Sequence, residues 1–311
     1  MTAFTTIADW IKEREAASKK SGSLLITVFG DVVAPHGGAI ALGSLVDAGG
    51  LAGISEQTIR SSVNRLITDG WLSSEAQGRR SIYRYSESGA KRDRLAQPRI
   101  YQNANDMWDG EWHVVVANNW SSDPELYAQY VRELMWTGFG KVSENVFIRP
   151  RMDDKSMCCN RELAEAIAPS SICFMAETAR CVTQEPLIDL IKRTWDLDTI
   201  KSRYEVFIDR YEPLLASVWK NPRLPGAQAF AIRLFMMHDF RRIRLVDPML
   251  PPSLLPDSWN GGQAFYVAHE LYDLLIPSSE QYVMEYMQGP EGRIPYLESW
   301  FYDRFGGLTR P

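Results

Sequence analysis

The chain has 311 residues, of which 45% are hydrophobic and 11% aromatic, so it can form two or three domains with buried cores. Its apolar runs are shorter than the roughly 18 residues that a membrane helix needs, and its first residues are too polar for a secretory signal. These features weigh against a membrane protein and a disordered chain, and they predict a globular, cytoplasmic protein.

Charge is distributed unevenly along the chain, which carries a formal net charge of −5. Residues 1–100 contain 13 Lys and Arg against 10 Asp and Glu, whereas the remaining residues contain 21 basic and 29 acidic side chains. A mildly basic amino-terminal part on an acidic body is typical of a protein that meets nucleic acid at that end only.

The four cysteines, Cys158, Cys159, Cys173 and Cys181, form no CxxC pair and are too few for a disulfide scaffold. We expect them to be reduced, buried thiols. An adjacent pair followed by single cysteines is also a poor framework for tetrahedral zinc. The sequence therefore predicts no metal site.

The amino-terminal elements begin with residues 1–22, which we expect to be a polar helix or tail outside the first core. The apolar string SLLITVFGDVV, residues 23–33, predicts a helix that Pro35, Gly37 and Gly38 end. In the next string, ALGSLVDAGG, apolar residues at i, i+3 and i+4 predict a second helix that stops at a double glycine.

Residues 55–70, SEQTIRSSVNRLITDG, carry the most informative pattern. Ile59, Val63, Leu66 and Ile67 repeat at i, i+4, i+7 and i+8, which predicts a helix with one apolar stripe. The first serine is a good N-cap, and the final glycine is a good helix end. The opposite face displays side chains that can bond to base edges or phosphates: Gln57, Thr58, Ser61, Asn64 and Arg65, with Arg60 at its edge.

The string WLSSEAQGRRSIYRY follows directly and predicts two short strands, with Arg79 and Arg80 at the tip and Arg84 farther along. Such a ribbon can lay its arginines along the phosphate backbone while the preceding helix occupies the major groove. Three helices followed by a basic hairpin predict a winged helix-turn-helix DNA-binding domain over residues 23–86. A small protein-interaction module is the alternative.

The central part of the chain begins with residues 87–107, which favour a helical linker rich in Lys and Arg. Strands and helices then alternate, which predicts a ferredoxin-like α+β domain over residues 108–185. The expected order is a strand at 112–117, a helix at 123–136, a strand in GKVSENVFIRP, a helix at 161–168 and a strand in SICFMAE.

The carboxy-terminal part, residues 186–311, has apolar residues at helical spacing and predicts a helical domain with effector and contact roles. The whole chain is thus expected to be a multidomain α+β protein.

Several long strings resemble the PaaX family of transcriptional regulators, which are repressors of aerobic phenylacetate catabolism in bacteria. The resemblance covers nearly the whole chain. It is carried by SLLITVFGDVVAPHGGAIALGSLV, RSSVNRLITDGWL, WHVVV, MWTGFGKVSENVFIRPR and, above all, HDFRRIRLVDPMLPPSLLPDSWNG.

The resemblance implies the three domains just described, a dimer formed through the central sheet, and an effector whose binding releases the repressor from its operator. That effector is phenylacetyl-CoA or a related acyl-CoA thioester. The central domain is similar to small CRISPR-associated nucleases, which place a metal-binding aspartate after the first strand. Here that place holds Asn118 and Asn119, so metal-dependent cleavage is not expected.

An effector with phosphates and an apolar acyl end calls for Arg or Lys beside aromatic residues. The segment RLFMMHDFRRIRL has this character, and its candidate effector-binding residues are Arg241, Arg242, Arg244 and His238. In the alternative interpretation, these arginines pair with nearby acids such as Asp239, and the histidine is a satisfied core residue.

The sequence contains no GxSxG, HExxH or Walker-type phosphate loop, so we expect no catalytic residue, no cofactor and no enzyme. The expected function is that of a homodimeric repressor bound to an inverted repeat whose half-sites lie about one helical turn, ~34 Å, or a multiple of it apart. Rival functions are an effector-binding interaction protein that does not contact DNA, and a nuclease or thioesterase.

Roles on the DNA follow from side-chain chemistry. The residues expected to contact bases are Gln57, Thr58, Ser61 and Asn64. Those expected mainly to bind phosphates are Arg60, Arg65, Arg79, Arg80 and Arg84.

Overall fold

The computed structural model describes residues 6–17, 21–78, 80–103, 108–117, 124–151, 171–178 and 184–310. The chain divides into two compact units that are not contiguous in sequence. Unit 1 comprises residues 1–102, 206–242 and 262–311, and unit 2 comprises residues 103–205 and 243–261. The expected succession of separate domains is therefore not observed, because much of the predicted carboxy-terminal domain packs with the amino-terminal elements.

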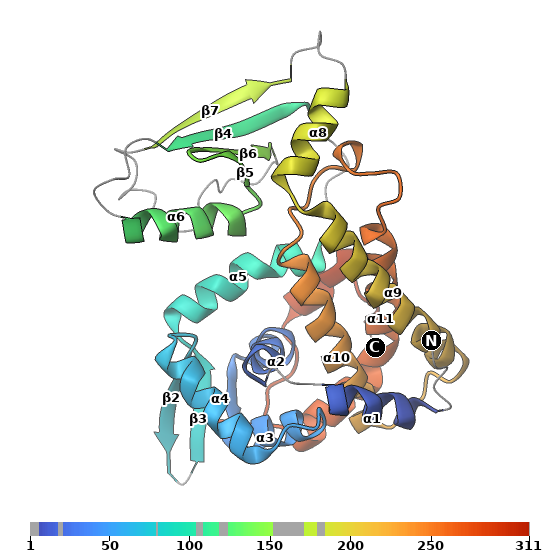
Figure 1. Ribbon diagram of the computed structural model, residues 1–311. Coiled ribbons are helices and arrows are strands. Elements are labelled where there is room, and N and C mark those ends of the chain that lie inside the picture. The colour runs from blue at the N-terminus through green and yellow to red at the C-terminus, as the bar shows by residue number, and fades with distance from the viewer. Residues whose placement is uncertain are drawn as a thin grey trace. The chain divides into compact units, whose positions relative to one another are not determined.

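Unit 1 contains helices from both ends of the sequence, which carry blue and orange to red colours in Figure 1. Its elements are α1 (Ile7–Ala17), α2 (Ser21–Val28), β1 (Ala39–Ala41), α3 (Leu42–Gly50), α4 (Glu56–Thr68), β2 (Leu72–Gln77), β3 (Arg80–Tyr85), α5 (Glu87–Tyr101), most of α9 (Leu197–Lys220), of α10 (Gly226–Arg244) and of α11 (Gly261–Tyr286), the short β8 (Gln288–Gly289) and β9 (Gly292–Arg293), and the 3-10 segment η5 (Ser299–Gly306).

The amino-terminal helix α1 belongs to the core of unit 1, which corrects the expectation that this segment lies outside it. Trp10 is only 4% exposed, and its ring meets those of Tyr211 and Phe235 edge-on at centroid distances of 5.6 and 6.2 Å. Arg14 adds a 2.8 Å ion pair to Asp239. The polar composition of this helix concealed one apolar face.

The first apolar helix runs farther than the sequence predicts. After α2 the chain continues through a π-helical turn, Phe29–Val33, and a 3-10 turn, Ala34–His36. Proline is tolerated in the first turn of such a segment because its missing N–H has no helical partner there. The helix ends at Gly37, whose φ of 80° is left-handed.

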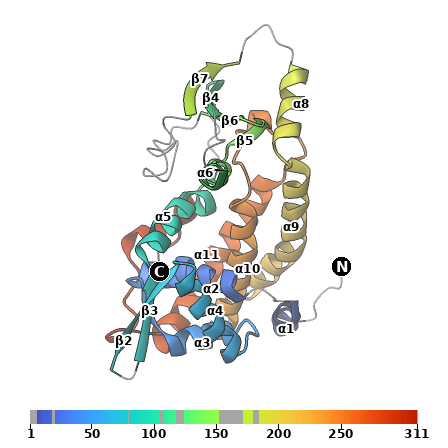
Figure 2. The same cartoon turned by 60° about the vertical axis from the view of Figure 1, so that its left-hand side comes forward.

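Helix α4 and the hairpin after it agree with the predicted elements. The hydroxyl of Ser55 accepts from the backbone N–H of Thr58 at 3.3 Å, and the stripe of Ile59, Val63 and Leu66 is buried. Strands β2 and β3 form an antiparallel hairpin. The hairpin extends away from the helices of unit 1 in both views (Figure 1; Figure 2).

A third strand, β1, pairs with β3 and gives the small sheet the order β1-β3-β2. No sequence pattern predicts β1, because its three residues are too few to show an alternation. Ala39 and Ala41 pack there against Ile82.

Helix α5 is helical as predicted but does not act as a linker. Its residues Ala96, Ile100 and Tyr101 are buried, and all of it belongs to unit 1. Three of the basic residues that suggested a linker, Lys91, Arg92 and Arg94, are exposed.

Unit 2 is built on a four-stranded antiparallel sheet of order β5-β6-β4-β7. Its elements are β4 (Glu111–Ala117), α6 (Pro124–Trp136), β5 (Gly140–Ser143), β6 (Val146–Pro150), β7 (Ser171–Glu177), α8 (Gln184–Thr194), the start of α9 and a 3-10 turn, η4 (Pro252–Leu254). The segment predicted as one strand, GKVSENVFIRP, is the β5–β6 hairpin. The helix predicted at residues 161–168 lies outside the described residues.

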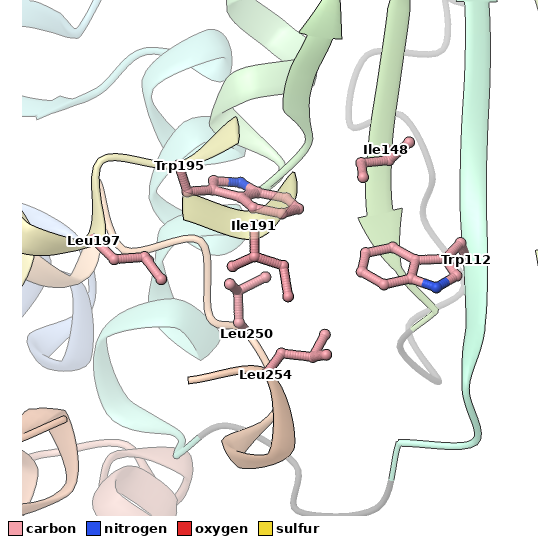
Figure 3. Packing of buried hydrophobic residues seen from close by; sticks show 7 residues of the cluster. All are labelled: Trp112, Ile148, Ile191, Trp195, Leu197, Leu250 and Leu254. Atoms are coloured by element: carbon pink, nitrogen blue, oxygen red, sulfur yellow. The ribbon is translucent and has the colours of Figure 1, made fainter. Parts of the chain in front are cut away.

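Side chains of successive residues in β4 point to opposite faces of this sheet, as the two-residue period of a strand requires. Val115 and Ala117 pack against α6, which covers one face. Trp112 faces the other way and joins Ile148 in a cluster completed by residues of α8, of the 195–197 segment after it and of the 243–261 segment (Figure 3). That cluster consists of Trp112, Ile148, Ile191, Trp195, Leu197, Leu250 and Leu254.

The helices predicted after residue 186 are present, although they divide between the two units. None of the helices in the described part of the chain is both long enough and apolar enough to span a membrane.

An ionic cluster fills the centre of unit 1. The Asp31 carboxylate, 3% exposed, accepts from Arg233 Nε at 2.8 Å and from Arg304 Nη1 at 3.1 Å. The hydroxyls of Tyr101 and Tyr272 each donate to its Oδ1 at 2.8 Å.

A second carboxylate completes the cluster. Glu280 binds the 1% exposed Arg233 and lies 2.8 Å from Nε2 of His36. Burial raises the pKa of Glu280, but Arg233 and His36 outweigh this effect and lower that pKa to about 2. Glu280 is therefore ionised and shares Arg233 with Asp31.

Asp31→Asn is expected to lower the free energy of unfolding by about 3–5 kcal/mol, because it leaves two buried guanidinium groups with too few acceptors. Urea denaturation followed by circular dichroism measures the effect. The exposed Asp69→Asn on the same unit is the control and should change stability by less than about 0.5 kcal/mol. Equal effects of the two changes would contradict the central role of Asp31.

Candidate functional site

The exposed face of α4 carries every side chain that the sequence analysis assigned to it. The apolar stripe turns inward, and Ser62 beside it is buried with its hydroxyl 2.6 Å from that of Ser21. This packing fixes the rotation of α4. The exposed residues are Gln57, Thr58, Arg60, Ser61, Asn64 and Arg65.

Two of these side chains already have partners within the helix. The Thr58 hydroxyl lies 2.8 Å from that of Ser55 at the N-cap. Arg60 forms an i,i+4 ion pair with Glu56, with Nη2 and Oε1 2.7 Å apart. Because both members of this pair are more than half exposed, a phosphate competes for Arg60 against only a weak surface interaction.

The hairpin places basic residues along one strand. Arg80 and Arg84 are both exposed on β3, and their spacing of four puts them on the same face. Arg80 is paired with Gln77 at the tip, and Arg84 lies in the central strand opposite Ser73 and Ala39. Arg79 lies outside the described residues.

The four residues proposed for effector binding do not gather at one place. His238 is buried, and Arg242 is exposed on the same helix. Arg241 has its pKa lowered by burial, while Tyr85 and Asp93 act in the opposite direction. Arg244 is buried in unit 2 and hydrogen-bonds Tyr204. Helical residues one or two positions apart do not face each other, so Arg241 and Arg242, or Arg242 and Arg244, need not meet although they are close in the sequence.

His238 has a specific place in the core. The Thr27 hydroxyl lies 3.1 Å from its Nδ1 and 3.2 Å from the carbonyl oxygen of Ser23. Burial is the largest cause that lowers the pKa of His238, to about 4, and Arg242 and Arg241 act in the same direction. The alternative interpretation of His238 as a core residue fits this position.

The neighbouring Asp239 forms its ion pairs with arginines from outside this segment. It accepts instead from Arg14 and Arg210, each at 2.8 Å, and from the Tyr211 hydroxyl at 2.8 Å. Asp239 thus fastens α1 and α9 to α10 within unit 1.

A pocket that sequence reasoning missed opens in unit 1 between β3, α5 and η5. Its volume is about 670 Å³, within the usual range of small-molecule sites. One face of α5 supplies lining residues at helical spacing, and η5 supplies others more than 200 positions away in the sequence. No local motif can reveal such a combination. The side chains on which the site depends are Arg84, Tyr85, Arg94, Tyr101, Trp300 and Arg304.

Hydrogen bonds make one wall of this pocket rigid. The Tyr85 hydroxyl donates to Asp93 Oδ1 at 3.1 Å, with the Ile26 carbonyl oxygen 3.3 Å away. Gln97 Nε2 donates to Asp93 Oδ2 at 3.0 Å and to the Gly30 carbonyl oxygen at 3.3 Å. Burial raises the pKa of Asp93, although these hydrogen bonds counteract it.

The pocket lining also includes aromatic side chains. Trp300 is 36% exposed and donates its indole N–H to Glu298 at 2.7 Å. The Arg304 guanidinium stacks over Tyr101, 4.2 Å from the ring centroid, and belongs to the Asp31 cluster. Flat apolar surfaces with fixed polar groups at their edges suit a ligand that combines an aromatic group with a charged one.

No three His, Cys, Asp or Glu side chains in the described ranges converge as metal ligands would. Cys173, on β7, is exposed, which corrects the expectation of a buried thiol at this position, although partial desolvation of its sulfur still raises the pKa of the thiol. The other three cysteines lie outside the described residues.

A model of the PaaX-like protein family matches residues 20–89, and one of the PaaX-like protein C-terminal domain matches residues 195–285. The chain is 32% identical over 289 residues to a protein of Escherichia coli (strain K12) named Transcriptional repressor PaaX, covering 92% of this chain and 90% of that one. The chain therefore belongs to the PaaX-like family, as its sequence indicated.

Among solved structures, the Uncharacterized protein Rv0674 from Mycobacterium tuberculosis aligns with 77% of this chain and 89% of its own. The identity is 22% and the TM-score 0.46, a similarity too low to establish a shared fold.

The burial of neutral His238 predicts a dependence of stability on pH. Its pKa of about 4 in the folded state lies below its ordinary value of about 6.5, so the folded state resists protonation. The stability it contributes is complete above pH 6.5 and is lost as the pH falls toward 4. Between pH 7 and 5 the loss is about 2 kcal/mol.

Urea denaturation at the two pH values, on the wild type and on His238→Gln, measures this effect. Glutamine keeps a hydrogen-bonding group toward Thr27 but does not titrate, so the variant should lose about 2 kcal/mol less than the wild type between pH 7 and 5. The same loss in both proteins would assign the pH dependence to other groups.

Proposed function

We propose that this protein is a transcriptional repressor of phenylacetate catabolic genes and that it binds its operator through α4 and the β2–β3 hairpin. The observation that carries the proposal is the exposed polar face of α4 beside a hairpin with basic residues, in a chain 32% identical to Transcriptional repressor PaaX. The similarity to a transcriptional repressor also supports a regulator rather than an enzyme, which agrees with the expectation from the sequence.

The local geometry supports a winged helix-turn-helix. Helices α2, α3 and α4 are followed by a hairpin whose inner strand pairs with β1, an arrangement in which α4 is the recognition helix. Helix α4 would enter the major groove, while Arg79, Arg80 and Arg84 would hold phosphates.

The strand order β5-β6-β4-β7 supports a ferredoxin-like domain in unit 2. Strand β7 is at an edge of the described sheet, and its Ile172, Phe174 and Met175 are about half exposed. Exposed apolar side chains on an edge strand favour pairing with another chain. We propose that this edge forms a homodimer, which would place two α4 helices on an inverted repeat.

The effector in this proposal is phenylacetyl-CoA or a related acyl-CoA thioester, whose binding would release the repressor from DNA. An effector-binding protein that does not contact DNA is the main rival. A gel-shift assay with the DNA upstream of its own gene separates the two, because only the repressor retards that DNA.

Arg80→Ala should weaken binding to all DNA sequences and reduce the slope of log affinity against log salt by about 1, because one phosphate contact is lost. Asn64→Ala should instead relax discrimination at one or two base pairs, with the salt slope unchanged. Fluorescence anisotropy with operator and scrambled DNA at several salt concentrations measures both effects. Arg132→Ala in unit 2 is the charge control. An unchanged slope in Arg80→Ala would remove the hairpin from the interface.

Phe174→Asp should convert the dimer into a monomer, because it buries a charge at the proposed interface. Size-exclusion chromatography with light scattering measures the mass. Ile188→Asp in the same unit is the matched control, since Ile188 is 48% exposed and Phe174 is 50% exposed. A dimer that survives Phe174→Asp would move the interface elsewhere.

A further inference from the structure

The charged groups of the pocket between β3, α5 and η5 differ in whether they already have partners. Asp93 is held by Tyr85 and Gln97, and Glu298 accepts from Trp300. Arg304 is occupied by Asp31 and by the hydroxyl of Tyr272, 2.9 Å from Nη1. These groups form the walls of the pocket.

Three other charged lining residues, Arg84, Arg94 and Asp303, are exposed and form no ion pair with any residue that the structure describes. Two unpaired guanidinium groups against one unpaired carboxylate favour an anionic ligand. Guanidinium groups bind carboxylate and phosphate oxygens especially well because they can donate two parallel hydrogen bonds. The aromatic wall beside them favours a flat apolar group in the same ligand.

The position of Arg84 links this pocket to the DNA-binding elements. Arg84 lies on the same strand and the same face as Arg80 at the hairpin tip, and it also lines the pocket. The next residue, Tyr85, forms part of the hydrogen-bonded pocket wall. One arginine is thus placed to bind either a DNA phosphate or an anion in the pocket.

We propose that this pocket binds the aryl-acyl part of the effector and a neighbouring anionic group, and that effector and operator compete for Arg84. This inference rests on the proposed function and locates its effector site in a pocket that none of the α10 residues suggested by the sequence lines. Release from DNA then needs no long-range conformational change. A ligand that engages Arg84 removes one phosphate contact and fixes the base of the hairpin.

Three variants test the proposal with phenylacetyl-CoA as the probe. Arg94→Ala removes an exposed pocket cation that is not on a DNA-binding element, and Ala90→Trp fills the pocket without changing charge. Lys91→Ala is the matched control, because it removes one positive charge from an exposed position of the same helix outside the pocket. Calorimetry measures thioester binding, and anisotropy of labelled operator measures DNA binding and release.

We expect Arg94→Ala and Ala90→Trp to bind phenylacetyl-CoA at least about tenfold more weakly while their affinity for operator stays unchanged. Unchanged operator affinity also shows that the variants are folded. Lys91→Ala should behave as the wild type does. Wild-type thioester affinity in both pocket variants would overturn the proposal.

Arg84→Ala tests the competition itself. It should weaken both operator and thioester binding, whereas Arg80→Ala should weaken operator binding alone. In the wild type, the apparent affinity for phenylacetyl-CoA should fall as operator DNA is added. Thioester binding that is unaffected by Arg84→Ala would overturn the shared use of this residue.

The wild-type measurements distinguish a failure of the proposed function from a failure of the pocket proposal alone. If the wild type binds no operator, or if phenylacetyl-CoA does not release it from the operator, both the proposed function and the pocket proposal are overturned. A wild type that binds and is released, with pocket variants that respond as it does, would overturn the pocket proposal alone.

Discussion

The Asp31 carboxylate is the group on which the architecture of unit 1 depends. It lies in a π-helical turn near the amino terminus, yet its ion-pair partners, Arg233 and Arg304, come from α10 and η5 more than 200 positions later. A buried charge is tolerated only when its partners are all in place, since removing one leaves an uncompensated charge in a low-dielectric interior. The two ends of the chain therefore fold together as one unit.

The same turn connects the two candidate functional surfaces. Carbonyl oxygens of Ile26 and Gly30 are contacted by the pocket-wall residues Tyr85 and Gln97. At the other end of α2, Ser21 hydrogen-bonds Ser62 of α4. A further Arg304 hydrogen bond, from Nη2 to the Gly30 carbonyl oxygen at 2.8 Å, holds the turn in place. Helix α2 thus supports the predicted recognition helix with one end and the pocket with the other.

Unit 2 presents a different kind of surface. Its β4 strand contributes buried residues to clusters on both faces, whereas the neighbouring β7 strand leaves several apolar side chains half exposed. The exposed apolar side chains of this edge strand make β7 the candidate site for association with a second chain. The proposed dimer edge thus belongs to unit 2, whereas the proposed DNA-binding elements and the pocket belong to unit 1.

The sequence by itself determined the local elements with short-range causes. The stripe of α4, its Ser55 cap and the hairpin that follows all depend on neighbours within a few positions, and each was read correctly. The family was also fixed by sequence, because long irregular strings carry it. Sequence patterns failed where the cause was not local: the burial of Trp10, the three-residue strand β1 and the packing of α5.

Only the tertiary structure decided which distant residues meet. The arginines of α10 looked like a ligand cluster because they are adjacent in sequence, but the helix distributes them to different surroundings. The pocket, in contrast, joins Arg84 and Arg94 to Trp300 and appears in no single segment. Local patterns record which face of an element is apolar, whereas charge pairing and cavity lining depend on contacts between segments far apart in the chain, which no local spacing encodes.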